Sequence, residues 1–202
     1  FAAVLCSLGI HSESVEASEL IVTDDKFQSA VPMMKLTCEQ IKSKITPLMK
    51  SGIVPVVTGF LGATESGVIT TLGRGGSDYS AAILGNCLNA EQVWIWTDVD
   101  GVMTSDPRLV TDAQVLSKLS YRELSELAYF GAKVVHPRTI RPVIAQNIPL
   151  LVKNTFNPES PGTMIVPEAE QIPSTVKAVT AIEGLSLVNV EGRGMIGVPG
   201  IA

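Results

Sequence analysis

The stretch of residues 71–80, TLGRGGSDYS, constrains the fold of this chain more than any other. Apolar residues recur at helical spacing over residues 77–88, so we expect a helix there with Ser77 as its N-cap. The first N–H groups of such a helix, with flexible glycines in front of them, favour a bound anion. Arg74 adds a planar guanidinium that suits a carboxylate or phosphate, while Asp78 suits an ammonium, a magnesium ion or an arginine. The stretch predicts an anion site, with a capped helix after a glycine turn as the alternative.

A second polar segment follows residues 93–96, an apolar run that predicts a buried strand. The run stops at Thr97 and Asp98, and ligands of open α/β sheets bind beyond the carboxyl ends of the strands. The loop that follows carries three more charged residues: Asp100, Asp106 and Arg108. Carboxylates suit magnesium and arginine suits phosphate, so the loop predicts a phosphate site. Asp-Gly and Asp-Pro are also ordinary turn formers, which leaves an acidic surface turn as the alternative.

A third segment, FGAKVVHP at residues 130–137, joins two predicted helices. Ser120 and Glu123 have the spacing of a capping box that opens the first helix, which we expect to end near Gly131. Pro137 suits the first position of the second helix. Lys133 lies in the corner between them, where its apolar neighbours predict a half-buried ammonium that faces a negative group.

Together, residues 72–80, 97–102, 106–108 and 130–137 resemble the aspartokinases of the amino-acid kinase superfamily. The 97–102 motif is similar to other amino-acid kinases as well, whereas the first and last motifs together are specific to aspartokinases. Residues 154–163 also resemble the end of that catalytic domain. The resemblance implies the three-layer sandwich of amino-acid kinases. The alternation of predicted strands and helices independently indicates an α/β fold with a mostly parallel sheet and helices on both faces.

The resemblance implies an activity: transfer of the γ-phosphoryl group of ATP, with Mg2+, to the side-chain carboxylate of L-aspartate. The product would be 4-phospho-L-aspartate, the first step towards lysine, threonine and methionine. Arg74 and Asp78 match catalytic positions, and the implied substrate-binding residues are Arg74, Gly75, Gly76 and Ser77. The implied nucleotide-binding residues are Thr97, Asp98, Met103, Asp106, Arg108, Lys133 and Val134. Met103 departs from the tyrosine of many relatives, and no protein-only metal site is expected.

Several other classes are excluded or disfavoured. The sequence contains neither a Walker lysine loop nor the His-Arg-Asp and Asp-Phe-Gly motifs of protein kinases. Its 202 residues, 46% hydrophobic and 17% charged, indicate a compact globular chain. A net charge of −5 argues against nucleic acid as a partner. The apolar runs are too short for a membrane span and no signal peptide is seen, so we expect a cytoplasmic protein, or a plastid one if the source is a plant.

The three cysteines, Cys6, Cys38 and Cys87, are scattered and without metal-ligand spacing. We expect them to be free thiols in a reducing compartment. Two histidines, His11 and His136, are too few for a zinc site, and His136 is interpreted as a helix-entry residue.

The sequence divides into three parts: residues 1–166 as the C-terminal part of a kinase domain, 167–175 as a polar linker, and 176–202 as the start of an ACT-like domain. Residues 176–182 and 185–190 are predicted strands. Residues 1–9 resemble the last turns of a helix that Gly9 closes, and the Lys-Phe-Gly-Gly-Thr segment of aspartokinases is absent. We therefore expect this chain alone to be inactive, and the parent protein to form homo-oligomers through ACT-like domains.

The sequence also fits two alternatives to aspartate kinase. The 97–102 motif alone fits another amino-acid or carbamate-type kinase of the same fold. A non-catalytic module that binds an amino acid is the second alternative.

Overall fold

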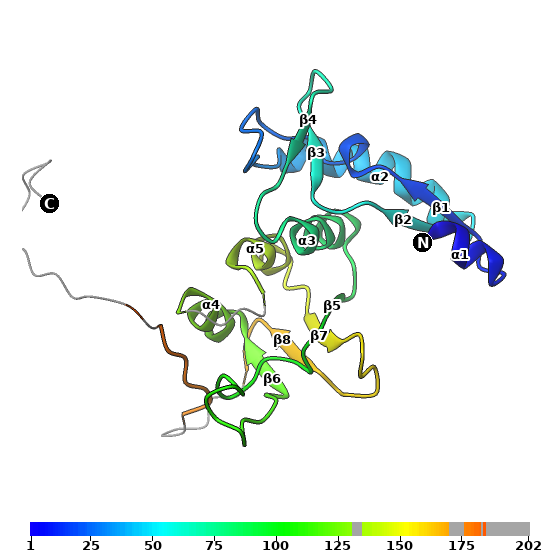
Figure 1. The fold of residues 1–202 in the computed structure, drawn as a ribbon. Coiled ribbons are helices and arrows are strands. Elements are labelled where there is room, and N and C mark those ends of the chain that lie inside the picture. The colour runs from blue at the N-terminus through cyan, green and yellow to red at the C-terminus, as the bar shows by residue number, and fades with distance from the viewer. Residues whose placement is uncertain (131–134, 170–175, 183, 185–202) are drawn as a thin grey trace, which may run out of the picture.

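A computed structural model describes residues 1–130, 135–169, 176–182 and 184 of the chain (Figure 1). The helices are α1 (Ala2–Ser7), the 3-10 helix η1 (Ala17–Glu19), α2 (Met34–Lys50), α3 (Gly76–Leu88), α4 (Tyr121–Tyr129) and α5 (Pro137–Ala145). The strands are β1 (Ser12–Val15), β2 (Val54–Val57), β3 (Leu61–Ala63), β4 (Ile69–Thr71), β5 (Val93–Thr97), β6 (Lys118–Ser120), β7 (Leu150–Asn154) and β8 (Thr163–Val166).

The strands form three small sheets within the described ranges. β1 and β2 pair in parallel, and β3 and β4 form an antiparallel hairpin. The largest sheet has the order β5-β7-β8-β6, with β5–β7 and β6–β8 parallel and β7–β8 antiparallel. Helices alternate with mainly parallel strand pairs, which confirms the predicted α/β class.

Helix α3 lies between two hydrophobic cores, as its central place in Figure 1 indicates. Ala82 packs into one core with α4, α5 and the four-stranded sheet. Ile83 and Cys87 pack into the other core with α2, β1 and the segment after β1. Burial on two sides fixes this helix firmly, and its N-terminus carries the glycine stretch.

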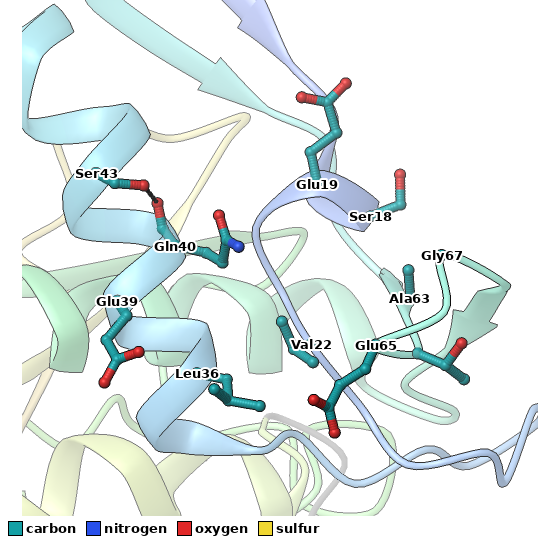
Figure 2. A pocket seen from close by; sticks show the side chains of 11 residues that line it. Ser18, Glu19, Val22, Leu36, Glu39, Gln40, Ser43, Ala63, Glu65 and Gly67 are labelled. Atoms are coloured by element: carbon teal, nitrogen blue, oxygen red, sulfur yellow. Dashed lines mark hydrogen bonds between the residues drawn. The ribbon is translucent and has the colours of Figure 1, made fainter.

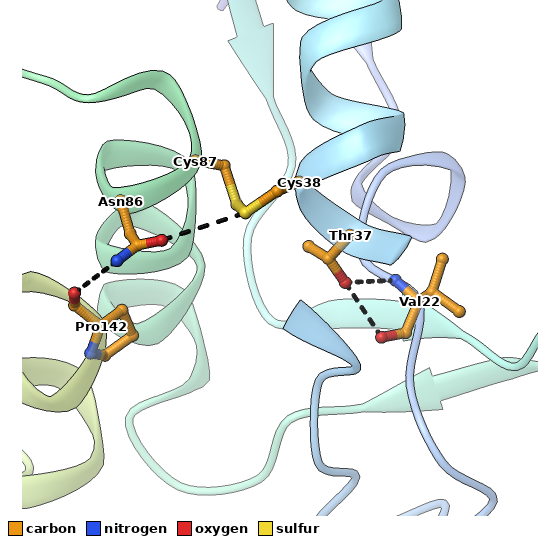
Figure 3. Close-up of a disulfide and its surroundings, with 6 residues drawn as sticks. All are labelled: Val22, Thr37, Cys38, Asn86, Cys87 and Pro142. Atoms are coloured by element: carbon orange, nitrogen blue, oxygen red, sulfur yellow. Dashed lines mark hydrogen bonds between the residues drawn. A yellow bond between two sulfur atoms is a disulfide. The ribbon is translucent and has the colours of Figure 1, made fainter. Parts of the chain in front are cut away.

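The expectation of three free thiols is wrong. Cys38 of α2 and Cys87 of α3 form a disulfide, with their Cα atoms 4.8 Å apart (Figure 3), and Cys6 remains free. A separation of 49 residues gave no sign of this pairing, because only the folded chain brings α2 beside α3. Next to the disulfide, Asn86 Nδ2 donates to the Pro142 carbonyl at 2.7 Å. The end of α3 is therefore tied to both α2 and α5.

The prediction of a fully buried strand at residues 93–96 is wrong for one face. Val93 and Ile95 of β5 are buried, whereas Trp94 and Trp96 are 48% and 46% exposed. Successive side chains of a strand point to opposite faces, so Val93 and Ile95 face the helix-covered core while Trp94 and Trp96 face the open side. The side chains of β2 are likewise only partly buried or exposed.

Residues 176–182 do not form the predicted strand. They lie instead against the rest of the chain, where Lys177 Nζ pairs with Glu123 Oε1 at 2.7 Å and the Val179 amide donates to the Thr104 carbonyl at 2.8 Å. The predicted strand at 185–190 lies outside the described residues. Within the described part, no helix combines the length and apolar character needed to cross a membrane.

Candidate functional site

The glycine stretch forms a tight turn that leads into α3. Gly73 and Gly75 have φ angles of +77° and +72°, a region that glycine enters at little cost. The Gly76 amide donates to the Gly73 carbonyl at 3.0 Å, which closes the turn. A Cβ on Gly75 would lie 2.6 Å from His136 Cβ, and one on Gly76 would lie 2.7 Å from a ring carbon of Phe60. Glycine is required here because neighbouring residues occupy the space of a side chain.

The predicted N-cap is wrong. Gly75, in the left-handed conformation, is the N-cap of α3, and Ser77 is an exposed residue in its first turn. The reason is the tight turn between Gly73 and Gly76, which starts the helix two residues earlier than expected. No side chain caps α3, so its first free N–H groups keep their capacity for an anion.

The two charged residues of this stretch differ in exposure. Arg74 is exposed, as a group that receives a ligand from solvent must be. Asp78 is half-buried in the first turn of α3, and this burial raises the pKa of its carboxyl above the ordinary value. Among the described residues, no side chain donates a hydrogen bond to the Asp78 carboxylate.

The third motif meets the first. The capping box at Ser120 and Glu123 is confirmed, with the Ser120 amide donating to Glu123 Oε2 at 2.8 Å, and α5 begins at Pro137 as predicted. Val135 is buried in the core and His136 packs on Gly75, so the segment before α5 borders the glycine turn. Gly131, Lys133 and Val134 lie outside the described residues.

The acidic loop begins at the end of β5. The Thr97 hydroxyl donates to Asp98 Oδ1 at 3.2 Å, and the Asp98 side chain is exposed. Asp100 has a different role, because its Oδ1 accepts hydrogen bonds from Asn154 Nδ2 at 2.8 Å and Asn157 Nδ2 at 3.1 Å. Asp100 therefore fastens the loop to the end of β7.

The rest of the loop is held by its own polar groups. Arg108 Nε lies 3.0 Å from Asp106 Oδ1, and Arg108 Nη2 lies 2.5 Å from Asp106 Oδ2, in a bidentate ion pair. Met103 forms an isolated antiparallel bridge with Val115 and is partly exposed. The Thr163 hydroxyl accepts from the Val102 amide at 2.8 Å, which anchors the start of the loop to β8.

Helix α3 connects the glycine turn to the acidic loop through residues 89–92 and β5. A Cβ on Gly85 would lie 2.4 Å from a methyl carbon of Val93, so the C-terminal half of α3 packs closely on the start of β5.

Sequence reasoning missed four residues that support these segments: Ser29, Arg138, Asn154 and Asn157. Asn154 and Asn157 lie in the 154–163 motif, but nothing local indicated that their amides bind Asp100. Ser29 and Arg138 are 109 residues apart and carry no motif.

A separate hollow of about 470 Å³ lies between η1, α2 and the β3–β4 hairpin (Figure 2). Its wall includes Glu19, Glu39 and Glu65, and it contains none of the predicted site residues. Among the described residues, no three His, Cys, Asp or Glu side chains gather in a way that could hold a metal ion. A cation at the predicted site would therefore need ligands in addition to such side chains.

Comparison with known proteins gives the same picture as the motifs. The model of the amino acid kinase family matches residues 1–154. The bifunctional aspartokinase/homoserine dehydrogenase 2 of Zea mays, a chloroplastic protein, is 46% identical over 192 residues, which are 93% of this chain and 21% of that protein. The bifunctional aspartokinase/homoserine dehydrogenase of Haemophilus influenzae is 53% identical over 149 residues, 74% of this chain and 18% of that protein.

Solved structures of aspartokinases also resemble this chain. Aspartokinase III of E. coli, in complex with aspartate and ADP, superposes with a TM-score of 0.79 at 36% identity, over 84% of this chain and 38% of that one. The chain thus spans between about a fifth and two fifths of the length of the relatives that it matches.

Proposed function

This chain belongs to the amino acid kinase family, and we propose that it forms part of an aspartate kinase. The reaction would transfer the γ-phosphoryl group of ATP to the side-chain carboxylate of L-aspartate and yield 4-phospho-L-aspartate. The observation that carries the proposal is the packing of the glycine turn and α3 against His136. It unites the two motifs that are specific to aspartokinases. The complex of E. coli aspartokinase III with aspartate and ADP supports the choice of both substrates.

We assign the acceptor to the start of α3. The exposed Arg74 guanidinium would bind a carboxylate of aspartate in bidentate fashion, with the backbone of Gly75, Gly76 and Ser77 beside it. The free N–H groups of the first turn favour negative charge at the same place. Asp78 would pair with the substrate ammonium, since its carboxylate is half-buried and free of protein donors in the described part of the chain.

We assign the nucleotide to the loop after β5 and to the corner before α5. Thr97 and Asp98 lie at the strand end, and Met103, Asp106 and Arg108 follow on the loop. Lys133 and Val134 are assigned to this site from their positions in the sequence alone. Phosphoryl transfer depends mainly on positioning and on cations that neutralise charge, so the arginines and the lysine carry the mechanism.

Magnesium fits this site as a companion of ATP. In proteins it is commonly held by one or two carboxylates together with the substrate phosphates, and it would supply positive charge to those phosphates. Asp98 offers an exposed carboxylate just beyond β5, and the Thr97 hydroxyl donates a hydrogen bond to it. No larger protein cage is needed for such an ion.

The remaining parts of the proposal concern the whole protein. We propose that residues 1–166 belong to the catalytic domain, 167–175 to a linker and 176–202 to an ACT-like regulatory domain through which the parent protein forms homo-oligomers. The names of the plant relatives support a plastid location if the source is a plant, and a cytoplasmic one otherwise. Another amino-acid kinase of the same fold is the second candidate, because the 97–102 motif is shared more widely.

The test is an assay of acyl phosphate formation in the full-length gene product. Hydroxylamine would trap the product from ATP and L-aspartate, with L-glutamate, N-acetyl-L-glutamate and carbamate as competing acceptors. We expect hydroxamate with aspartate alone. Arg74→Lys keeps the charge but loses the planar fork, so the KM for aspartate should rise and that for ATP should not. Arg122→Lys, in the exposed pair with Glu126, is the matched control. Phosphorylation of a different acceptor would replace the proposal with the second candidate.

A further inference from the structure

The start of α5 touches the glycine turn on one side. His136 is the N-cap of α5 and its Nδ1 accepts from the Arg138 amide at 3.3 Å. Its Cβ fills the space beside Gly75 where a side chain would otherwise stand. The position of α5 is therefore coupled directly to the backbone that leads into α3.

Arg138 reaches a second neighbour of the same turn. Its Nη1 donates to Ser29 Oγ at 2.6 Å, across 109 residues of sequence, and both side chains are partly buried. Ser29 Cα lies only 3.4 Å from the Cβ position of Gly73, and the Gln28 carbonyl lies 3.1 Å from it. Segment 27–30 thus packs closely against the first glycine of the turn.

Backbone hydrogen bonds join segment 27–30 to the strand that enters the turn. The Ala30 amide donates to the Thr71 carbonyl at 2.9 Å, and the Thr71 amide donates to the Phe27 carbonyl at 2.9 Å. Arg74 follows Thr71 by three residues. Segment 27–30, the glycine turn and the start of α5 therefore form a closed ring of contacts, and the Arg138–Ser29 bond is the side-chain link that closes it.

Arg138 and Arg74 both act on the histidine at the start of α5. Burial lowers the pKa of His136, and the positive charges of Arg138 and Arg74 lower it further.

We propose that Arg138 is a positioning residue of the acceptor site. Its hydrogen bond to Ser29 holds segment 27–30 against Gly73 and thereby fixes the direction in which Arg74 leaves the turn. This role rests on the proposed function, because Arg74 is assigned there to the carboxylate of the acceptor. A displaced Arg74 would weaken the acceptor and leave the nucleotide, on the far loop, unaffected.

The kinetic test uses the full-length gene product with Arg138→Gln, Ser29→Ala and the double variant. Arg141→Gln is the matched control, because Arg141 lies on the same helix, is exposed and shares with Arg138 an electrostatic effect on Tyr79. We expect the KM for aspartate to rise roughly tenfold to a hundredfold in both single variants, the scale of a displaced binding group, with the KM for ATP unchanged. The double variant should be no worse than Arg138→Gln, and Arg138→Lys should recover part of the affinity.

Three results would overturn the role: an equal rise in the KM for ATP, additive effects in the double variant, or the same loss in Arg141→Gln. A parent protein that phosphorylates no aspartate would refute the proposed function and, with it, the role in acceptor binding. Hydrogen exchange then separates the structural claim. The Ala30 and Thr71 amides should exchange faster in Arg138→Gln than in Arg141→Gln, and equal exchange would remove the Arg138–Ser29 link as well.

Discussion

The glycine turn and the acidic loop are both proposed to meet anions, yet they are built in opposite ways. At the turn, the backbone approaches its neighbours so closely that a Cβ on Gly75 would lie 2.6 Å from His136. At the loop, side chains hold an open backbone, as Asn154 and Asn157 do through Asp100. Close packing tolerates no added atom, whereas a network of polar side chains can lose one bond at a time.

Gly75→Ala should break the turn and have the largest effect. The new residue would keep a φ of +72° and push its Cβ into His136, so we expect the free energy of unfolding to fall by about 2–5 kcal/mol in urea denaturation. Gly67→Ala is the matched control, with a φ of +82° and no atom within 4 Å of the new Cβ. Strain of the backbone alone should cost it about 1–2 kcal/mol. Equal losses in the two variants would mean that contact with His136 adds nothing.

The disulfide should contribute the next largest effect, because it fixes the helix that follows the turn. A bond between cysteines 49 residues apart is expected to stabilise the fold by about 2–4 kcal/mol. Cys38→Ser should lose this stability in oxidising buffer and show no further loss on addition of a reductant. Cys6→Ser, which removes the free thiol, should match the unchanged protein. If reduction leaves the Tm of the unchanged protein where it was, the bond has no such role.

The same contrast explains what the sequence could predict. The capping box and the proline that opens α5 are local patterns, and each led to the right element. The start of α3 was misplaced because a left-handed Gly75 and the N-cap preference of Ser77 compete within three residues, and turn geometry decided.

Long-range partners could not be predicted. The pairing of Cys38 with Cys87, the bond from Arg138 to Ser29 and the fastening of Asp100 depend on elements that only the folded chain brings together. The apolar run at residues 93–96 predicts burial on both faces. Apolar composition alone does not reveal that one face of β5 is open to solvent. Motifs thus indicated the candidate site residues, whereas the residues that hold those motifs in place are visible only in the fold.

Asp100→Ala should disturb the acidic loop and leave the turn intact. It removes the acceptor shared by Asn154 and Asn157, so we expect a loss of about 1–3 kcal/mol in stability and severalfold weaker ATP binding by calorimetry. Asp112→Ala is the control, since Asp112 carries the same charge and is exposed farther along the loop. Similar weakening in both variants would point to net charge. A loss of aspartate affinity instead would contradict the division between the two regions.

Asp78→Asn should have the smallest effect on stability, and in the opposite direction. Burial raises the pKa of Asp78 in the folded protein, so the fold favours the protonated form, and stability is lost as the pH rises through that pKa. An asparagine carries no charge to desolvate, so at neutral pH the Tm of the variant should exceed that of the unchanged protein by about 1–2 °C, or roughly 0.5 kcal/mol. Below about pH 3.9, where the carboxyl is protonated even in the unfolded chain, the variant and the unchanged protein should unfold at the same temperature.

Thermal scans at neutral and acidic pH measure this difference, while the hydroxamate assay should show activity strongly reduced in Asp78→Asn. A variant that is less stable at neutral pH would mean that Asp78 has a stabilising partner in the protein. Its carboxylate would then not be reserved for the substrate.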